Sequence, residues 1–169
     1  MKKNIVIISV IVCAISSLIL LMLFKDNSLG SSKNEDSKIS NVISEWYEPL
    51  SKMYINDVEV MVSIAITSEE LMKGLSDTPF LPKNVIKLFV FPVEEYWGIW
   101  MKDMNYAIDI LWIDKDGKIV HKEVDVSPDT YPETFEPRLP AKYVIETSSG
   151  FMNKYDIQLG DRVVLPQIK

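Results

Sequence analysis

The octet at residues 97–104, WGIWMKDM, places two tryptophans and two methionines around an adjacent lysine and aspartate. Trp97 and Trp100 have flat apolar rings on which a ligand such as a sugar can stack. Lys102, beside Asp103 in an apolar cleft, would suit proton transfer if burial lowered its pKa. The same residues also suit one side of a hydrophobic core. We favour the core because nothing in the sequence indicates that a lysine here is desolvated.

If the octet is a strand, alternate side chains point to opposite sides of it. Lys102 and Asp103 then cannot pair with each other, and we expect core aromatic residues with charges at the margin of the strand. The alternative is that the octet is a ligand platform. Trp97 lies beside the flexible Gly98. We therefore expect Trp97 to be more exposed than Trp100.

Asp109 lies in the segment AIDILWI (107–113), on a strand face that is otherwise apolar. Burial of an unpaired charge is costly, so a partner is expected. A structural ion pair or loop clamp is favoured, and a functional carboxylate is the alternative. The candidate partners are backbone amides of the proline-rich loop and the side chains of Lys102, Lys142 and Arg138.

Glu146, in the segment YVIETS, offers a second carboxylate. Paired with Asp109, it could form the two-acid site that cleaves a glycosidic bond, and Asp103 is another acid that could pair with Asp109. Most carboxylates are solvated surface groups, and the sequence does not give the separation of these ones. A hydrolase with paired carboxylates is therefore the alternative hypothesis.

Motifs for other reactions are missing. His121 is the only histidine, on a face that looks solvent-exposed, so a multi-histidine metal site within one chain is excluded. There is no G-x-S-x-G, no glycine-rich phosphate loop and no C-x-x-C. The segment DKDG (114–117) reads as a hairpin turn rather than a calcium loop. We expect neither a cofactor nor a metal.

The elements that position these residues are mostly strands. Val58, Val60 and Val62 begin a period-two pattern that is typical of a strand, and Thr67 with Glu70 forms a capping box for a short helix. Asn56–Asp57 fits a hairpin turn. The sequence predicts a mainly β fold, a compact antiparallel sandwich or barrel with one or two short helices. The expected strands lie at 58–66, 86–91, 107–113, 118–126, 142–148 and 162–166, and a second short helix lies at 150–155.

The segment 127–141 holds four prolines in fifteen residues and shows no period. Loops of this length are uncommon in compact domains unless they are functional or disordered. Tyr131, Phe135 and Leu139 can pack down, so we expect an ordered cover over one end of the sheet. Tyr131 joins the candidate binding residues for this reason.

The N-terminal residues 1–25 read as a transmembrane anchor. Lys2 and Lys3 precede an uncharged apolar run at 5–24, which is long enough to cross a lipid bilayer as a helix. A cleaved leader and a core helix are the alternatives, and Cys13 reads as a membrane cysteine rather than a lipidated one. The basic residues precede the run, so we expect a cytoplasmic N-terminus and an extracytoplasmic domain.

Residues 26–45 are polar and small, which favours a flexible linker before an exported domain at 46–169. From residue 39 onward, 13 lysines or arginines stand against 21 acids, a net charge of −8. Nucleic acid is therefore not an expected partner. The expected partners are the lipid bilayer and an unidentified ligand or protein of the cell envelope.

Seven blocks follow one another between about Ile55 and Val163, and in this order they closely resemble the domain of unknown function 192 family. The resemblance implies a compact, mainly β fold in proteins that are often exported or anchored, and whose activity is not established. The blocks are SEELMKGLSDTPFLP, FVFP, WMKDM, IDILWIDKDGKIV, PDTYP, PAKYVIET followed by GF, and IQLGDRV.

Two departures from the family pattern stand out. Ile108 stands where relatives often have leucine, and cysteines that many relatives carry in the proline-rich loop are absent here. Any role that those cysteine thiols have in relatives is therefore not expected in this protein. The family's motif positions fall on Trp100, Met101, Lys102, Asp103, Met104, Asp109, Asp114, Tyr131, Pro132, Ala141, Tyr143 and Glu146.

Together these observations favour a non-enzymatic binding or accessory domain outside the membrane. The envelope hydrolase and a purely structural module are the alternatives. The candidate binding residues are Trp97, Trp100, Lys102, Asp103, Asp109 and Tyr131, and the candidate catalytic residues are Asp109 and Glu146.

Overall fold

The computed structural model describes residues 34–167. A compact unit begins at Val42, while residues 34–41 belong to a separate unit. The predicted anchor at 5–24 lies outside the described residues. Within the described residues, no helix is long and apolar enough to cross a membrane.

Part of the predicted flexible linker is helical, since residues 34–46 form helix. Val42 is buried in the core of the compact unit, and Ile43 and Trp46 pack against the same core. These three apolar side chains recur at helical spacing, which explains why a stretch with polar composition is ordered here.

The compact unit is mainly β, with one curled, mixed seven-stranded sheet and a separate two-stranded sheet. The large sheet has the order β6-β5-β8-β3-β2-β1-β9, and β4 pairs with β7. The elements are β1 (Leu50–Ile55), β2 (Val58–Ala65), α2 (Ser68–Lys73), β3 (Val85–Glu95), β4 (Ile99–Trp100), β5 (Ile108–Ile113), β6 (Ile119–Val126), η1 (Pro128–Thr130), β7 (Thr134–Phe135), β8 (Ala141–Ser148), α3 (Phe151–Lys154) and β9 (Val163–Val164).

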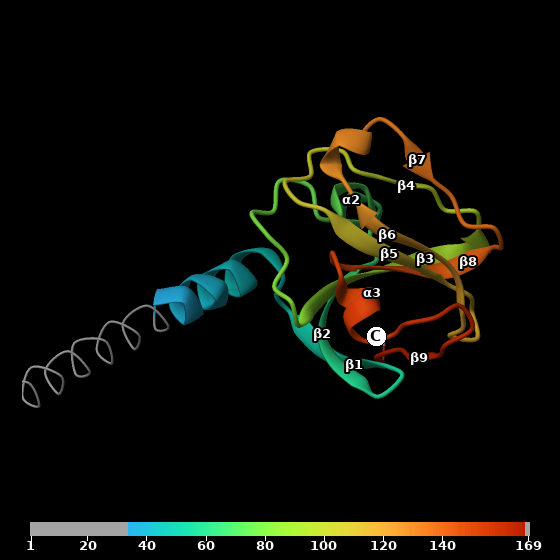
Figure 1. Ribbon diagram of the computed structural model, residues 1–169, viewed down its shortest axis with the longest axis horizontal. Helices are drawn as coiled ribbons and strands as arrows, with labels where there is room; N and C mark the ends of the chain where they lie inside the picture. The colour runs from blue at the N-terminus through green and yellow to red at the C-terminus, as the bar shows by residue number, and fades with distance from the viewer. Residues whose placement is uncertain (1–33, 168–169) are drawn as a thin grey trace, which may run out of the picture. The chain divides into compact units, whose positions relative to one another are not determined.

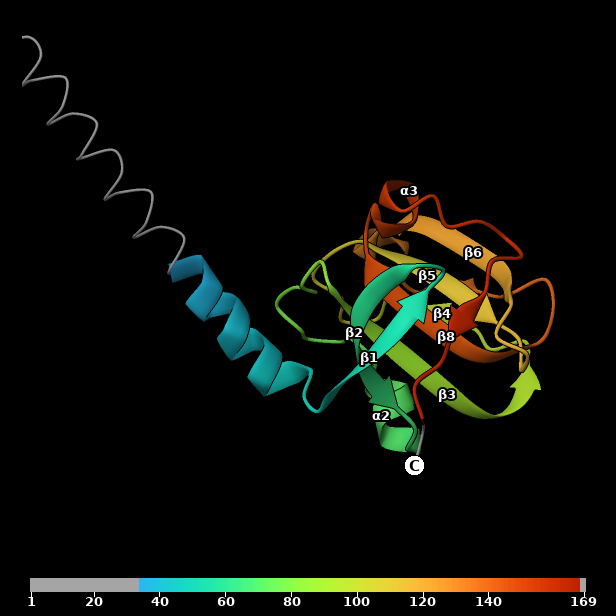
Figure 2. The same cartoon turned by 90° about the horizontal axis from the view of Figure 1, so that it is seen from below.

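The sheet is not wholly antiparallel, and it is not one half of a sandwich. Strands β2 and β3 run parallel, because the segment that carries α2 crosses over between them. An isolated bridge between Lys118 and Arg162 brings the chain before β9 to the start of β6, so the sheet curls toward closure (Figure 2). The predicted mainly β fold is confirmed, and the expected antiparallel sandwich or barrel is corrected to this curled, mixed half-barrel.

Each face of the curled sheet has its own hydrophobic core. One core includes Phe89, Ile110 and Val144, and the other includes Leu88, Leu111 and Ile145, as the alternation of strand side chains requires. Figure 1 shows α2, β4 and β7 on one side of strands β3, β5 and β8, and α3 and β9 on the other. The candidate site lies on the α2 side.

Two short-range predictions are confirmed at α2 and at the hairpin turn. Thr67 is the N-cap of α2 and forms the capping box with Glu70, and the C-cap is Gly74. The turn between β5 and β6 is closed by Asp114, whose Oδ1 accepts bonds from the backbone amides of Asp116 and Lys118. The capping box and the turn are each formed by residues close together in the sequence, so their geometry does not depend on the surrounding fold.

The proline-rich loop is ordered, as expected. It contains η1 and β7, and β7 pairs with β4 through Ile99 opposite Phe135 and Trp100 opposite Thr134. The expectation for His121 is wrong, because its side chain is buried. The ring packs on Trp112 at a centroid distance of 5.3 Å, beside a register shift between β5 and β6.

Candidate functional site

Asp109 is a clamp that joins three parts of the fold. Its carboxylate is buried and accepts backbone N–H bonds from Asp125 at 2.9 Å, Gly150 at 3.3 Å and Met152 at 3.0 Å. These amides belong to the end of β6 and to the start of α3. The carboxylate thus supplies the cap that Gly150, without a side chain, cannot give to α3.

The partners expected for Asp109 are not the ones the fold provides. Lys142 donates instead to the carbonyl of Pro92 at 2.7 Å. Lys102 and Arg138 are exposed, and the three amides come from outside the proline-rich loop. The need for a partner was predicted correctly, but its identity was wrong.

Sheet register separates Asp109 from Glu146. Asp109 on β5 lies opposite Thr147 on β8, whereas Glu146 lies opposite Ile110. Directly paired residues point to the same face and successive residues to opposite faces. The two carboxyl groups therefore lie on opposite faces of the sheet and cannot act on one bond, so this pairing of the hydrolase hypothesis is wrong.

Asp103 does not complete an acid pair in its place. It lies with Lys102 in an exposed turn after β4, with a left-handed φ of 55°. Its carbonyl accepts the backbone N–H of Asp77 at 2.8 Å, and the carbonyl of Lys102 accepts the hydroxyl of Ser76 at 2.8 Å. This turn is thereby attached to the loop after α2.

Glu146 lies at the base of a cavity on the α2 side of the sheet. The residue is 5% exposed, and among the described residues its Oε2 atom has no hydrogen-bond partner. Burial raises the pKa of Glu146 to about 8, although the charge of Lys87 acts in the opposite direction. At neutral pH Glu146 is therefore mostly a neutral carboxylic acid, with an O–H donor and an acceptor oxygen.

Three polar residues cross the sheet beside this acid. Ser63 on β2, Lys87 on β3 and Glu146 on β8 are register neighbours, so they share one face. The ammonium of Lys87 donates to the hydroxyl of Ser63 at 3.2 Å. Burial lowers the pKa of Lys87, partly offset by the charge of Glu146. No ion pair within 4.0 Å joins Lys87 to Glu146 in the described part of the chain.

A second polar group lies within electrostatic range of Glu146. The hydroxyl of Tyr106 lies 2.5 Å from that of Thr78 and 3.4 Å from that of Tyr47, which donates to the carbonyl of Phe80 at 2.7 Å. Burial raises the pKa of Tyr106 and of Tyr47, and the charge of Glu146 adds to both effects. These hydroxyls are neutral at physiological pH and bond to one another and to backbone carbonyls.

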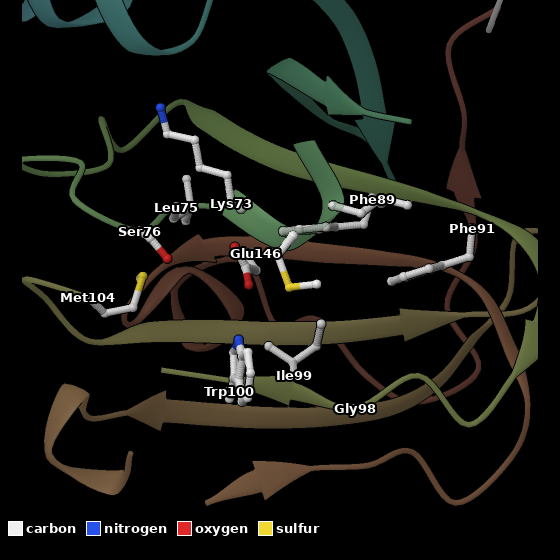
Figure 3. A pocket seen from close by; sticks show the side chains of 13 residues that line it. Lys73, Leu75, Ser76, Phe89, Phe91, Gly98, Ile99, Trp100, Met104 and Glu146 are labelled. Atoms are coloured by element: carbon white, nitrogen blue, oxygen red, sulfur yellow. The ribbon is translucent and has the colours of Figure 1, made fainter. Parts of the chain in front are cut away.

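The cavity at Glu146 has a volume of about 80 Å³. In Figure 3 the carboxyl group of Glu146 lies in the middle of the cavity, with side chains of the α2 segment above it and Ile99 and Trp100 below it. The ammonium of Lys73 points away from the acid in that view and lies over the ring of Trp46 at 5.3 Å from its centroid. The lining residues are Leu71, Met72, Lys73, Gly74, Leu75, Ser76, Phe89, Phe91, Gly98, Ile99, Trp100, Met104 and Glu146.

Two shallower spaces continue from the cavity toward the surface, and both include Met72 and Trp100. Each has a volume of about 350 Å³. The first is lined mainly by apolar residues, among them Phe91, Pro92 and Trp97, and the second by polar ones, among them Lys102 and Asp103. We call the cavity and these two spaces together the α2 groove.

The two tryptophans of the octet have roles opposite to those expected. Trp97 is partly buried and stacks on Phe91 with ring centroids 4.2 Å apart, and its carbonyl accepts the indole N–H of Trp112 at 2.8 Å. Trp100 is 44% exposed and meets Tyr131 edge to face. The expectation that Trp97 is the more exposed ring is wrong, because the Trp97 ring stacks on Phe91, which belongs to the core.

The strand predicted for the octet is only two residues long. It ends at Trp100, after which Met101 is buried and residues 102–103 form the turn. Four of the predicted binding residues, Trp97, Trp100, Lys102 and Asp103, line the α2 groove, and Tyr131 contacts Trp100. Asp109 is not part of this groove.

Glu146 was predicted only as an acid paired with Asp109, and the contribution of α2 to this groove was not predicted. A signal was available, because Glu146 and Lys87 each interrupt an apolar strand segment, in YVIETS and IKLFVF. What could not be predicted was that β3 and β8 are neighbours. Within residues 34–167, no group of three or more His, Cys, Asp or Glu side chains could hold a metal ion.

The fold resembles two solved structures. One is a Sinorhizobium meliloti 1021 protein proposed to be a transcription regulator, with a TM-score of 0.62, 23% identity, and coverage of 66% of this chain and 88% of that one. The other is a Novosphingobium aromaticivorans DSM 12444 protein of unknown function, with a TM-score of 0.65, 19% identity, and coverage of 70% and 91%. At these identities the likeness shows the fold alone.

No functionally curated protein matches this chain in sequence. A family model does match it, over residues 51–165, which include every strand from β2 to β9 and both the clamp and the groove. The chain belongs to the DUF192 family, whose description is "Uncharacterized ACR".

Proposed function

We propose that this protein is a non-enzymatic binding domain, displayed outside the membrane on its N-terminal apolar segment, with the α2 groove as its ligand site. The observation that carries the proposal is the buried carboxyl of Glu146, which has no hydrogen-bond partner for Oε2 among the described residues. A buried polar atom without a partner costs roughly 1–3 kcal/mol of stability. A module with a purely structural role gains nothing from that cost, because a leucine would fill the same place.

The surroundings of Glu146 support binding rather than catalysis. A hydrolytic site needs a second acid, or a nucleophile hydrogen-bonded to a base. The hydroxyl of Ser76 donates to the carbonyl of Lys102, and the ammonium of Lys73 lies over Trp46. Glu146 is the single acid lining the cavity in the described part of the chain. One acid between apolar walls suits recognition of a polar ligand group.

Thermal-shift screening of the full chain against cell-envelope fragments tests the proposal, with wild type and Glu146→Leu compared in parallel. We expect a ligand that raises the Tm of wild type but not that of Glu146→Leu, because the variant keeps the apolar walls and loses the polar anchor. Glu133→Leu changes an exposed acid and should respond as wild type does. If every stabilising fragment acts equally on all three proteins, the α2 groove is not the ligand site.

The location is tested separately. The apolar run at 5–24, preceded by Lys2 and Lys3, supports an extracytoplasmic domain. Protease added to intact cells should then cleave the chain between the run and the domain. A domain that is protected in intact cells and cleaved after lysis would overturn the proposed location.

A further inference from the structure

We infer that the α2 groove recognises an N-acetylated sugar, with the acetamido group in the cavity against Glu146 and the sugar ring against Trp100. This inference rests on the proposed function and names the class of ligand for the same site. It is supported by the size of the cavity, the charges around Glu146, the apolar walls and the partly exposed Trp100 at the mouth of the cavity.

The size of the cavity limits what can reach Glu146. Its volume of about 80 Å³ is less than a quarter of the volume of either outer space, at about 350 Å³ each. A ligand that fills the whole α2 groove therefore places its smaller part beside Glu146 and its larger part in the shallow spaces outside.

The charges around the acid favour a neutral substituent. Lys87 faces Glu146 from β3, Lys73 lines the cavity from α2, and the hydroxyls of Tyr47 and Tyr106 lie within electrostatic range. An ammonium group on the ligand would meet the repulsion of Lys87 and would require the acid to ionise. A neutral carboxylic acid has both a donor and an acceptor, so it can donate to the C=O of a secondary amide or accept a bond from its N–H.

The walls of the cavity match the rest of an acetamido group. Leu71, Phe89, Phe91 and Ile99 surround the space beside Glu146, so a methyl group would be buried among apolar side chains. Phe89, Phe91 and Trp97 form a continuous ring stack, with centroid distances of 6.4 and 4.2 Å. Such a wall holds its shape in the absence of a ligand, which reduces the entropy lost on binding.

The surface outside the cavity suits the ring that would carry this group. Trp100 lies at the mouth, borders both shallow spaces and is 44% exposed, and the ammonium of Lys102 lies over its ring at 5.9 Å from the centroid. Tyr131 fixes its orientation edge to face at 6.1 Å. The apolar face of a sugar can lie on such a ring, while its hydroxyls reach the polar space lined by Glu69, Lys102 and Asp103.

Three matched probes test the inference on the full chain, purified in a detergent without a sugar headgroup. They are the β-1,4-linked trimers of N-acetylglucosamine, glucosamine and glucose, which share the ring and differ in the substituent. Titration calorimetry should show binding of the acetylated trimer, weakened at least tenfold in Glu146→Leu and in Trp100→Ala. Tyr96→Ala removes an exposed aromatic ring that does not line the groove and should bind as wild type does.

The other outcomes overturn the inference in distinguishable ways. If the glucosamine trimer binds as tightly, the cavity takes an ammonium group. If the glucose trimer does so, Glu146 recognises a hydroxyl. In both cases the site remains a binding site. If no trimer binds but the fragment screen yields a different ligand that depends on Glu146, the sugar class is wrong and the proposed function stands. If nothing binds in either experiment, both fail.

Discussion

Replacing Glu146 by glutamine should change how the stability of the protein depends on pH. The pKa of this buried acid is about 8 in the folded chain, against an ordinary value of 4.5 that applies after unfolding. Between these two values the unfolded chain has lost the proton while the folded chain keeps it. Stability from this group is therefore fully present below pH 4.5 and is lost as the pH rises toward 8.

The size of the change in the free energy of unfolding follows from the difference between the two pKa values. Each pH unit between them changes the free energy of unfolding by about 1.4 kcal/mol. From pH 5 to pH 7.5 wild type should lose about 3 kcal/mol that Glu146→Gln, which carries no titratable proton, keeps. The two proteins share the other titratable groups, so the quantity to compare is the difference between their free energies of unfolding.

Urea denaturation followed by tryptophan fluorescence, at pH 5, 6 and 7.5, measures this difference. The advantage of Glu146→Gln over wild type should grow steadily with pH. Glu133→Gln, at an exposed site, should show a constant difference from wild type. If the difference for Glu146→Gln is constant to within about 0.5 kcal/mol, the acid is not held neutral by burial, and its protonation does not favour a neutral ligand group.

Three further predictions concern the clamp, the helix cap and the tryptophans. Asp109→Ala should lower the free energy of unfolding by about 4 kcal/mol in urea denaturation, because three backbone amides lose a charged acceptor; a loss below about 1 kcal/mol would show that the clamp is unimportant. Thr67→Ala should cost about 1 kcal/mol in the same assay through loss of the N-cap of α2, and no change would mean that the cap does not contribute. In acrylamide quenching, Trp100→Phe should lose more of the quenchable fluorescence than Trp97→Phe, and the reverse order would contradict the exposure of the two rings.

The strands were largely predictable, and their partners were not. The period-two pattern of β2 and the apolar runs of β3, β5 and β8 are visible in the sequence, because burial of one or both faces selects such residues. Pairing depends on contacts between distant segments, so the parallel neighbours β2 and β3 were not expected. The helical residues 34–46 were missed because only their few apolar side chains signal packing.

The candidate site was predictable in part for the same reason. Energetics alone required a partner for a carboxylate on an apolar strand face, and Asp109 has one. Its partners are backbone amides, which every residue except proline carries, so sequence gave no means of choosing them. Trp100, Lys102 and Asp103 were singled out from one octet, whereas Glu146 joins them only because β8 and β4 are brought together in the fold.

The pairing of β9 with β1 also constrains how the protein is made. Tyr54 and Ile55, in the first strand, find their neighbours in Val164 and Val163, in the last one. A nascent chain therefore carries an unpaired strand edge until nearly all of its residues have been synthesised. Such edges can pair with another chain. A stop codon just before Val163 would leave this two-residue part of the edge permanently open, so truncated products should aggregate during expression even though the other strands are intact.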